Sequence, residues 1–123
     1  MKKFSAHYIF PLASAPLKNG ILVIDENGFV QELVDTGGQI RETDRFEFHS
    51  GVLLPEINGL TMEKLRNRQE EMPQKLLEEI LRSLLPEGNC GFAPGQKAGV
   101  YLLYPLDMAN LRLTAKSKLK KLV

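Results

Sequence analysis

The feature that most constrains the fold is the pair Asn27-Gly28, which lies between two apolar runs rich in β-forming residues. The first run is Ile21-Leu22-Val23-Ile24, and the second is Phe29-Val30-Gln31-Glu32-Leu33-Val34. Asn and Gly both tolerate the positive φ that tight hairpin turns require, so this pair between such runs is a strong hairpin signal. The sequence therefore predicts an antiparallel hairpin over residues 21–34.

Further β signals extend from the N-terminus to Pro55. Residues 3–10 suit a strand that Pro11 closes, and the prolines and small residues of 11–16 predict a loop. Residues 45–49 alternate with period two, and Val52-Leu53-Leu54 continues the pattern to Pro55. The chain up to Pro55 is therefore predicted to form a small antiparallel β unit.

The pattern becomes helical after Asn58-Gly59. Thr61 suits an N-cap, with Glu63 in the first turn, and the sparse apolar residues that follow predict a polar surface helix. Pro73 suits the first turn of a second helix. The apolar residues of this second helix form one broad face, called the leucine face: Leu76, Leu77, Ile80, Leu81, Leu84 and Leu85. Such a face must pack on the sheet, on a second chain, or on both.

The last third returns to β structure. Residues 100–104 form an apolar strand pattern that ends at Pro105, and residues 106–110 suit a turn. Leucines within residues 111–123 could supply two further short strands.

The expected fold is therefore α+β: a small antiparallel β-sandwich assembled from N- and C-terminal segments, with one or two helices between them. On this basis we divide the chain into three parts. Residues 1–55 are the N-terminal β segment, residues 56–90 a helical connector, and residues 91–123 the C-terminal β segment of the same domain.

Length and composition limit the classes of function. The chain has 123 residues, whereas a (β/α)₈ barrel needs about 250. A net charge of +1 provides no overall field to attract nucleic acid or an acidic membrane. No stretch approaches the roughly 20 apolar residues of a membrane span, and His7 and Pro11 interrupt a signal-like start. The single cysteine, Cys90, excludes an internal disulfide, and we expect a soluble cytoplasmic protein.

Five segments resemble, in the correct order, parts of one enzyme superfamily: residues 6–11, 16–30, 46–55, 72–82 and 92–100. The segment 46–55 is similar to the strand that leads into the barrel of metal-dependent amidohydrolases. The segment 92–100 is similar to the Gly-Ser-Phe-x-Pro-Gly-Lys-x-Ala-Asp entry to the strand after that barrel. The resemblance is to the chlorohydrolase, cytosine-deaminase and adenosylhomocysteine-deaminase-like members. In these enzymes both chain ends pair into a composite β-sandwich, with the metal barrel inserted between them.

The resemblance also implies what is missing. The family strand continues into Gly-Phe-Val-Asn and a His-x-His metal pair, whereas here Glu-Ile-Asn-Gly-Leu follows Pro55 and no His occurs after His49. The later metal-binding histidines and the metal-binding Asp of the eighth strand have no counterparts, and Gly99 stands where many members have Asp. The resemblance therefore implies a composite domain whose catalytic barrel is absent.

No residues have the spacing of a catalytic or metal site. A hydrolytic zinc needs about three converging protein ligands, and the only nitrogen or sulfur donors of this kind are His7, His49 and Cys90, from separate segments. A nucleophilic pair of Cys90 and His49 is formally available, but nothing near Cys90 in the sequence favours a thiolate. The adjacent acids Glu70-Glu71 and Glu78-Glu79 diverge by about 100° on a helix. We therefore predict no catalytic residue, no cofactor and no metal ligand.

Four lysines near the C-terminus form the one charge run: Lys116, Lys118, Lys120 and Lys121. Alternation would place the first three on one side of a strand, where lysines protect an exposed edge from aggregation. No aromatic residue is interleaved for base stacking, so nucleic-acid binding is not expected and anion contact is the lesser alternative. The glycine-rich segment 91–95 lacks the Lys-Ser/Thr ending of a phosphate loop and predicts a turn.

Two functional hypotheses from different classes follow. The first is a non-catalytic, barrel-less relative of amidohydrolases that acts as a structural or self-association module. Its partner contact would be a homodimer through Leu76, Leu77, Ile80, Leu81 and Leu84. The second is a fragment of a metal-dependent amidohydrolase or deaminase that acts on non-peptide C–N bonds. An anion-binding module that uses the C-terminal lysines ranks third.

Overall fold

A computed structural model describes residues 1–12, 14–37, 46–86 and 91–123. Seven strands and two helices follow one another in the order β1 (Lys2–Ile9), β2 (Leu17–Lys18), β3 (Ile21–Ile24), β4 (Val30–Val34), β5 (Glu47–Pro55), α1 (Met62–Glu71), α2 (Leu77–Ser83), β6 (Val100–Asp107) and β7 (Arg112–Lys121).

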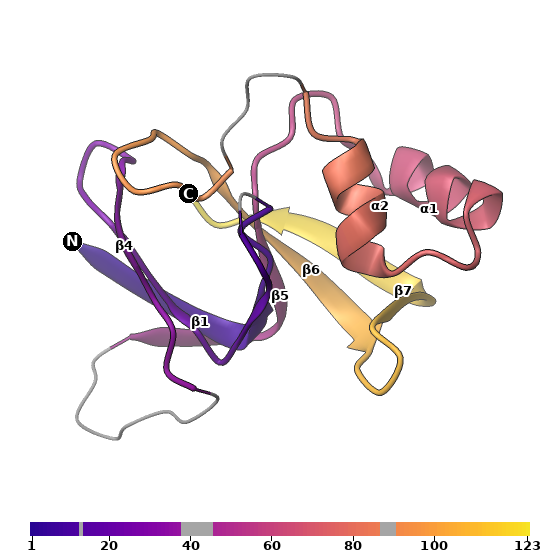
Figure 1. Cartoon of the computed structure of the whole chain (residues 1–123), viewed down its shortest axis with the longest axis horizontal. Helices are drawn as coiled ribbons and strands as arrows, with labels where there is room; N and C mark the ends of the chain where they lie inside the picture. Colours follow the sequence, from indigo (N-terminus) through magenta and orange to yellow (C-terminus); the bar gives the residue numbers. More distant parts are fainter. Residues whose placement is uncertain (13, 38–45, 87–90) are drawn as a thin grey trace.

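The strands form one sheet with the order β4-β3-β1-β5-β6-β7, and β2 pairs with β1 beside this path. The fold is therefore α+β, with N- and C-terminal strands in a common sheet and two helices between them in the chain (Figure 1). β1 and β5 are parallel, with Ala6 beside His49 and Ile9 beside Leu53. The other pairs are antiparallel.

Two details differ from the expectation. The sheet is mixed instead of antiparallel, because β5 lies beside β1 and runs in the same direction. The described strands also form a single open sheet, and no second, facing sheet is found among them. Long-range pairing of β5 with β1 and with β6 could not be inferred from local alternation, which fixes the face of a residue but not the neighbour of its strand.

The predicted hairpin is confirmed, because β3 and β4 pair around the turn Asp25–Gly28. Gly28 has φ +86°, whereas the φ of Asn27 is not positive. The Asp25 carboxylate organises the turn, since its Oδ1 accepts the backbone N–H groups of Asn27 and Phe29, both at 2.9 Å. Asp25 thus fills a role that the Asn-Gly signal alone does not reveal.

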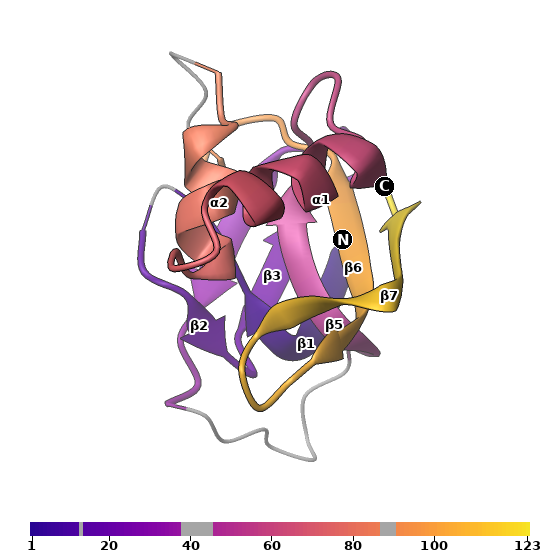
Figure 2. The same cartoon turned by 90° about the vertical axis from the view of Figure 1, so that its right-hand side faces the viewer.

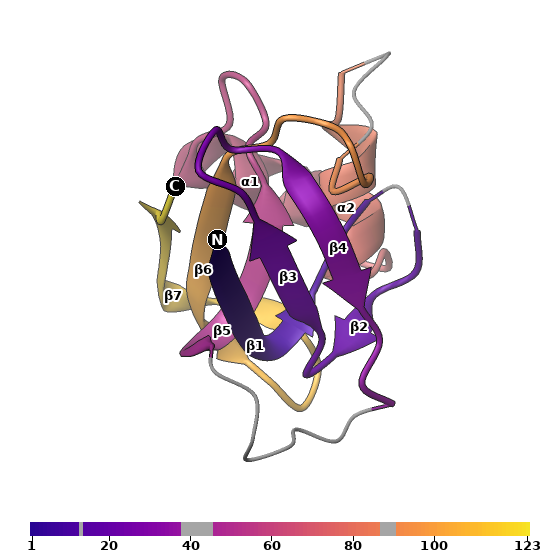
Figure 3. The same cartoon turned by 90° about the vertical axis from the view of Figure 1, so that its left-hand side faces the viewer.

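The sheet has a core on each face. Figures 2 and 3 show both helices on the same face of the sheet, in front of the strands in one view and behind them in the other. On that face the sheet residues Val52, Leu54 and Leu103 pack with buried leucines of both helices. The opposite core contains Leu53, Val100 and Phe92. β5 is thus buried on both faces at its C-terminal half, which explains its continuous apolar sequence.

The leucine face packs on the sheet of its own chain. Leu77, Ile80 and Leu81 are 3%, 1% and 0% exposed, whereas Leu76 is 63% exposed. The first of the two predicted partners for this face, the sheet, is therefore the observed one. Three buried side chains of this size contribute roughly 1.5–3 kcal/mol each.

The helix starts differ in how well they were predicted. Thr61 is the N-cap of α1, and its hydroxyl accepts the N–H of Lys64 at 3.2 Å, as the sequence predicts. α2 begins at Leu77, so the placement of Pro73 in its first turn is wrong. Pro73 lies in a turn, where its carbonyl accepts a hydrogen bond from the Arg112 guanidinium at 2.9 Å. This contact with a distant strand is not encoded in the local sequence.

The C-terminal strands are longer than predicted. β6 continues through Pro105 to Asp107, and β7 is one strand of 10 residues instead of two short ones. A register shift places residues 114–117 opposite Pro105. The Arg66 guanidinium of α1 donates to the carbonyls of Thr114, Ala115 and Ser117 at 2.8, 3.3 and 3.0 Å. This side chain holds residues 114–117, where the pairing of β7 with β6 is interrupted, and joins α1 to the sheet.

Candidate functional site

The chain leaves the sheet at the end of β5 and returns to it at the start of β6, and these two positions are paired. Pro55, the last residue of β5, pairs with Val100, the first residue of β6. The next pair is also joined, because the N–H of Glu56 donates to the carbonyl of Gly99 at 2.9 Å. The chain from residue 57 to residue 98 is thus a closed excursion, and the hydrogen-bonded pair Glu56–Gly99 is called the junction.

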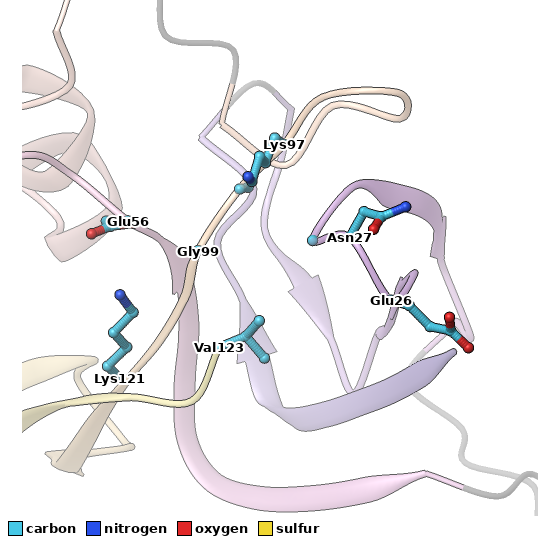
Figure 4. Close-up of a pocket in the computed structure, with 9 residues that line it drawn as sticks. Glu26, Asn27, Glu56, Lys97, Gly99, Lys121 and Val123 are labelled. Atoms are coloured by element: carbon cyan, nitrogen blue, oxygen red, sulfur yellow. The ribbon is translucent and has the colours of Figure 1, made fainter.

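An open hollow of about 420 Å³ lies beside the junction. Its lining comes from four separate parts of the chain: Glu26, Asn27, Gly28, Glu56, Lys97, Ala98, Gly99, Lys121 and Val123. Figure 4 shows Glu56 and Lys121 on one side, Lys97 at the rim, and Glu26 and Asn27 on the hairpin across from them. The segment after residue 94 is held to the hairpin by hydrogen bonds from Val30 to Gln96 and from Ala98 to Gly28.

The charges that line the hollow are solvated. Glu26, Glu56, Lys97 and Lys121 are all exposed, and within the described part of the chain none of them has an ion-pair partner within 4.0 Å. Exposed charges without fixed partners keep their hydration and hold no defined geometry. The hollow could therefore contact a polar group, but it does not orient one for a reaction.

Gly99 determines where the Glu56 side chain lies. A Cβ at position 99 would be 2.5 Å from Oε2 of Glu56 and 3.0 Å from its Cβ. The glycine therefore leaves the space that the Glu56 side chain occupies. Any larger side chain at position 99 would displace the carboxylate of Glu56.

The two histidines do not converge. The His49 ring packs 6.0 Å from the ring of Phe4, a member of the core opposite the helices. The His7 ring packs at 5.3 Å against Phe48, the residue before His49. Successive strand residues point to opposite faces, so His7 and His49 lie on different sides of the sheet. Cys90, the third predicted donor, lies outside the described residues.

Each histidine has a local structural environment. His7 Nδ1 accepts the N–H of Gly51 at 3.3 Å, which links β1 to the bulge in β5. His49 Nε2 is buried and makes no hydrogen bond of good geometry, although Oε2 of Glu47 lies 3.5 Å away. Among the residues that the structure describes, no three His, Cys, Asp or Glu side chains are grouped as metal ligands.

The helical acids form pairs with basic neighbours. Glu78 pairs with Arg82 and Glu79 with Lys75, both at a spacing of four residues. Glu78 and Glu79 thus have different partners, as the predicted divergence requires. These interactions stabilise α2 and place no carboxylate pair around a common point.

A second, mainly apolar hollow of about 380 Å³ lies beside the exposed end of the leucine face. Phe10, Leu77 and Leu111 contribute to its wall, and Leu76 lies at its edge. Among the described residues that line this hollow, Glu78 is the one titratable group, and it is paired with Arg82. The described lining therefore offers mainly apolar contact.

The sequence did not predict the junction or the residues around it. The segments 46–55 and 92–100 were predicted as a strand and as the entry to a strand, but the pairing of Pro55 with Val100 was not predicted. Glu26, Lys97 and Lys121 are brought together by pairing between distant strands, for which no local signal exists. Arg66 was also missed, because its partners are backbone carbonyls about 50 positions away in the chain.

Comparison of the chain with models of protein families, with curated proteins and with solved structures gives no match in any of the three cases. Among the described residues, no helix is both long enough and apolar enough to span a membrane.

Proposed function

We propose that the protein is a non-catalytic module that works by shape and contact, and that it is related to the composite domain of amidohydrolases without their barrel. The observation that supports this proposal best is the junction. Where the enzymes insert a barrel, this chain makes a short helical excursion whose two ends are hydrogen-bonded at 2.9 Å. The two helices fill the face of the sheet beside the junction with their own leucines.

We further propose that the mixed sheet is the counterpart of the composite β-sandwich. Its two cores lie on opposite faces, and strands from both chain ends contribute to each of them. In a sandwich one face of each sheet is buried against the other sheet; here the helices cover one face of the single sheet, and its own curvature and the C-terminal segment enclose the other core.

Self-association is the contact function that we propose for this module. Because Leu77, Ile80 and Leu81 are buried within one chain, a second copy could reach only the remainder of the leucine face. Leu76, 63% exposed beside the apolar hollow, is the residue best placed for this contact. Sedimentation at several concentrations tests it: a concentration-dependent dimer that Leu76→Ser abolishes supports the proposal, and a strict monomer removes it.

The alternative is that the chain is a piece of a working amidohydrolase or deaminase. Metal content separates the two proposals, since a hydrolytic site of that family needs about three converging ligands. The intact chain would be purified after growth with added zinc, iron and manganese, and the metals measured per mole of protein. A non-catalytic module retains far less than one metal per chain. One tightly bound metal per chain would contradict it and favour the enzyme fragment.

A further inference from the structure

β7 is an edge strand whose last part is open. It ends the strand order of the sheet, as the lysine run predicted, and pairs with β6 on its inner side. Among the described residues, α1 contacts the outer side of β7 in two places. Arg66 binds residues 114–117, and Oε1 of Gln69 accepts the N–H of Leu113 at 3.3 Å. From Lys118 to Lys121 no described residue beyond β6 makes a hydrogen bond to the strand. Figure 2 shows this strand at the rim of the sheet.

The open part of the edge is basic. Lys118, Lys120 and Lys121 are exposed, and within the described ranges none has an ion-pair partner. Lys118 and Lys120 share one side of the strand by alternation, and Lys121 extends toward the hollow that contains Glu56 (Figure 4). Lys116 lies outside this alternation, because the interrupted pairing at residues 114–117 breaks it and the Lys116 N–H donates to Oγ1 of Thr114.

Charge selects which strand can pair with this edge. Two copies of β7 placed edge to edge would bring lysines close to lysines, which is destabilising. An added strand that carries Asp or Glu would instead place carboxylates beside the ammonium groups. The strand has no aromatic residue between Lys116 and Lys121, so it lacks the stacking platform that single-stranded nucleic acid uses.

We propose that the β7 edge from Lys118 to Lys121 binds an extended acidic segment of another protein as an additional strand. Main-chain hydrogen bonds would supply the pairing, and the three lysines would select acidic side chains. Four residues of edge span about 13 Å, so the complex is weak and its affinity falls as salt screens the charges. This inference concerns the outer edge of β7, of which only Lys121 borders the hollow beside the junction, and it stands independently of the proposed function.

The test uses the full chain and a fluorescein-labelled peptide of eight residues that alternates Glu and Thr. Binding is measured by fluorescence anisotropy at low and at high salt. Two further peptides carry the same charge but are N-methylated, one at every Glu and the other at every Thr. Since alternate N–H groups of a strand point to opposite edges, one methylated peptide should lose about tenfold or more in affinity. The other should bind like the parent.

Protein variants provide the second arm. Lys118→Gln with Lys120→Gln should weaken binding of the parent peptide by about tenfold. Lys2→Gln with Lys3→Gln is the matched control, because these exposed lysines lie on β1, which has neighbours on both sides. This control should change affinity by less than about twofold, and circular dichroism checks that both variants are folded.

Several results would overturn the proposal. Equal binding of all three peptides would show a diffuse electrostatic contact without strand pairing. Equal losses in the two double variants would show that the edge is not the site. Tighter binding of a single-stranded oligonucleotide of the same charge would assign the surface to nucleic acid, and absence of any peptide binding at low salt would end the proposal directly.

Discussion

Gly51 is the residue at which the sheet tolerates least change. Its φ is +135°, and a Cβ would lie 2.5 Å from the backbone oxygen of Leu103. Gly51→Ala therefore combines strain with a clash against backbone, and we expect a loss of about 3 kcal/mol or more in the free energy of unfolding. Gly37→Ala is the control, because Gly37 has φ +67° and an added Cβ meets no atom of the described residues within 4 Å.

The Gly37 variant should lose only about 1 kcal/mol, the conformational cost of a left-handed L-residue. Urea unfolding of both variants measures the difference. Similar losses for the two would show that φ alone matters and that the close approach of β5 to β6 at Gly51 is not as described.

Arg66 is predicted to stabilise β7 through its three carbonyl contacts. Arg66→Ala should lower the free energy of unfolding by about 1.5 kcal/mol, the lower end of the range for hydrogen bonds to charged groups, since these contacts are only partly buried. Arg66→Lys should recover only part, because an ammonium cannot donate in a planar fork. Arg68→Ala serves as the control, since Arg68 makes one exposed contact at 3.9 Å with Glu71; an equal loss there would refute the special role of Arg66.

Two turn aspartates predict an acid-sensitive stability. The Phe29 N–H, followed by the Asn27 N–H and the Gln31 amide, lowers the pKa of Asp25. The Asn110 side chain and N–H lower the pKa of Asp107 in the β6–β7 turn. A lowered folded pKa stabilises the protein above the unfolded pKa, and this contribution is lost as the pH falls through the folded pKa.

Stability should therefore fall as the pH is lowered below about 4, the ordinary range of an Asp carboxyl. The urea midpoint measured against pH tests this. Asp25→Asn with Asp107→Asn should make the midpoint less dependent on pH in that range. An unchanged slope in the double variant would show that other carboxyls carry the acid response.

At the scale of the elements, α2 is held by its buried leucines. Leu81 is 0% exposed and packs in the core between helices and sheet, so Leu81→Ala should cost about 2–5 kcal/mol in unfolding free energy. Leu76→Ala, one residue before the same helix and 63% exposed, should cost less than about 0.5 kcal/mol. Thermal or urea unfolding of the two variants tests this, and comparable losses would contradict the packing of the leucine face on its own sheet.

Local signals predicted elements well where neighbouring residues in the sequence determine the structure. Asn27-Gly28 predicted the β3–β4 hairpin, and Thr61 predicted the start of α1. The wrong predictions concern strands whose arrangement depends on a partner that is distant in the sequence. β5 is parallel to β1 through pairing across about 40 residues, and β7 remains one strand because Arg66 of α1 satisfies carbonyls within residues 114–117. Periodicity contains no information on either partner.

For the whole molecule, the α+β class and the contribution of both chain ends to one β structure were predicted, whereas the single, mixed sheet in place of an antiparallel sandwich was not. The candidate site was not predicted. The pairing of residues 55 and 100 and the hollow at Glu56 and Lys121 both result from tertiary pairing. His7 and His49 lie on opposite faces, an arrangement that their separation in the sequence could not reveal.

We propose that this molecule acts through contact and does not activate water. The most direct measurement is ammonia release by the intact chain from a set of amides, amidines and aminated heterocyclic rings, with and without added zinc, iron or manganese, and with a chelator as control. We predict no release above the rate of the buffer for any substrate or metal. Turnover by the purified chain that the chelator abolishes would contradict the account.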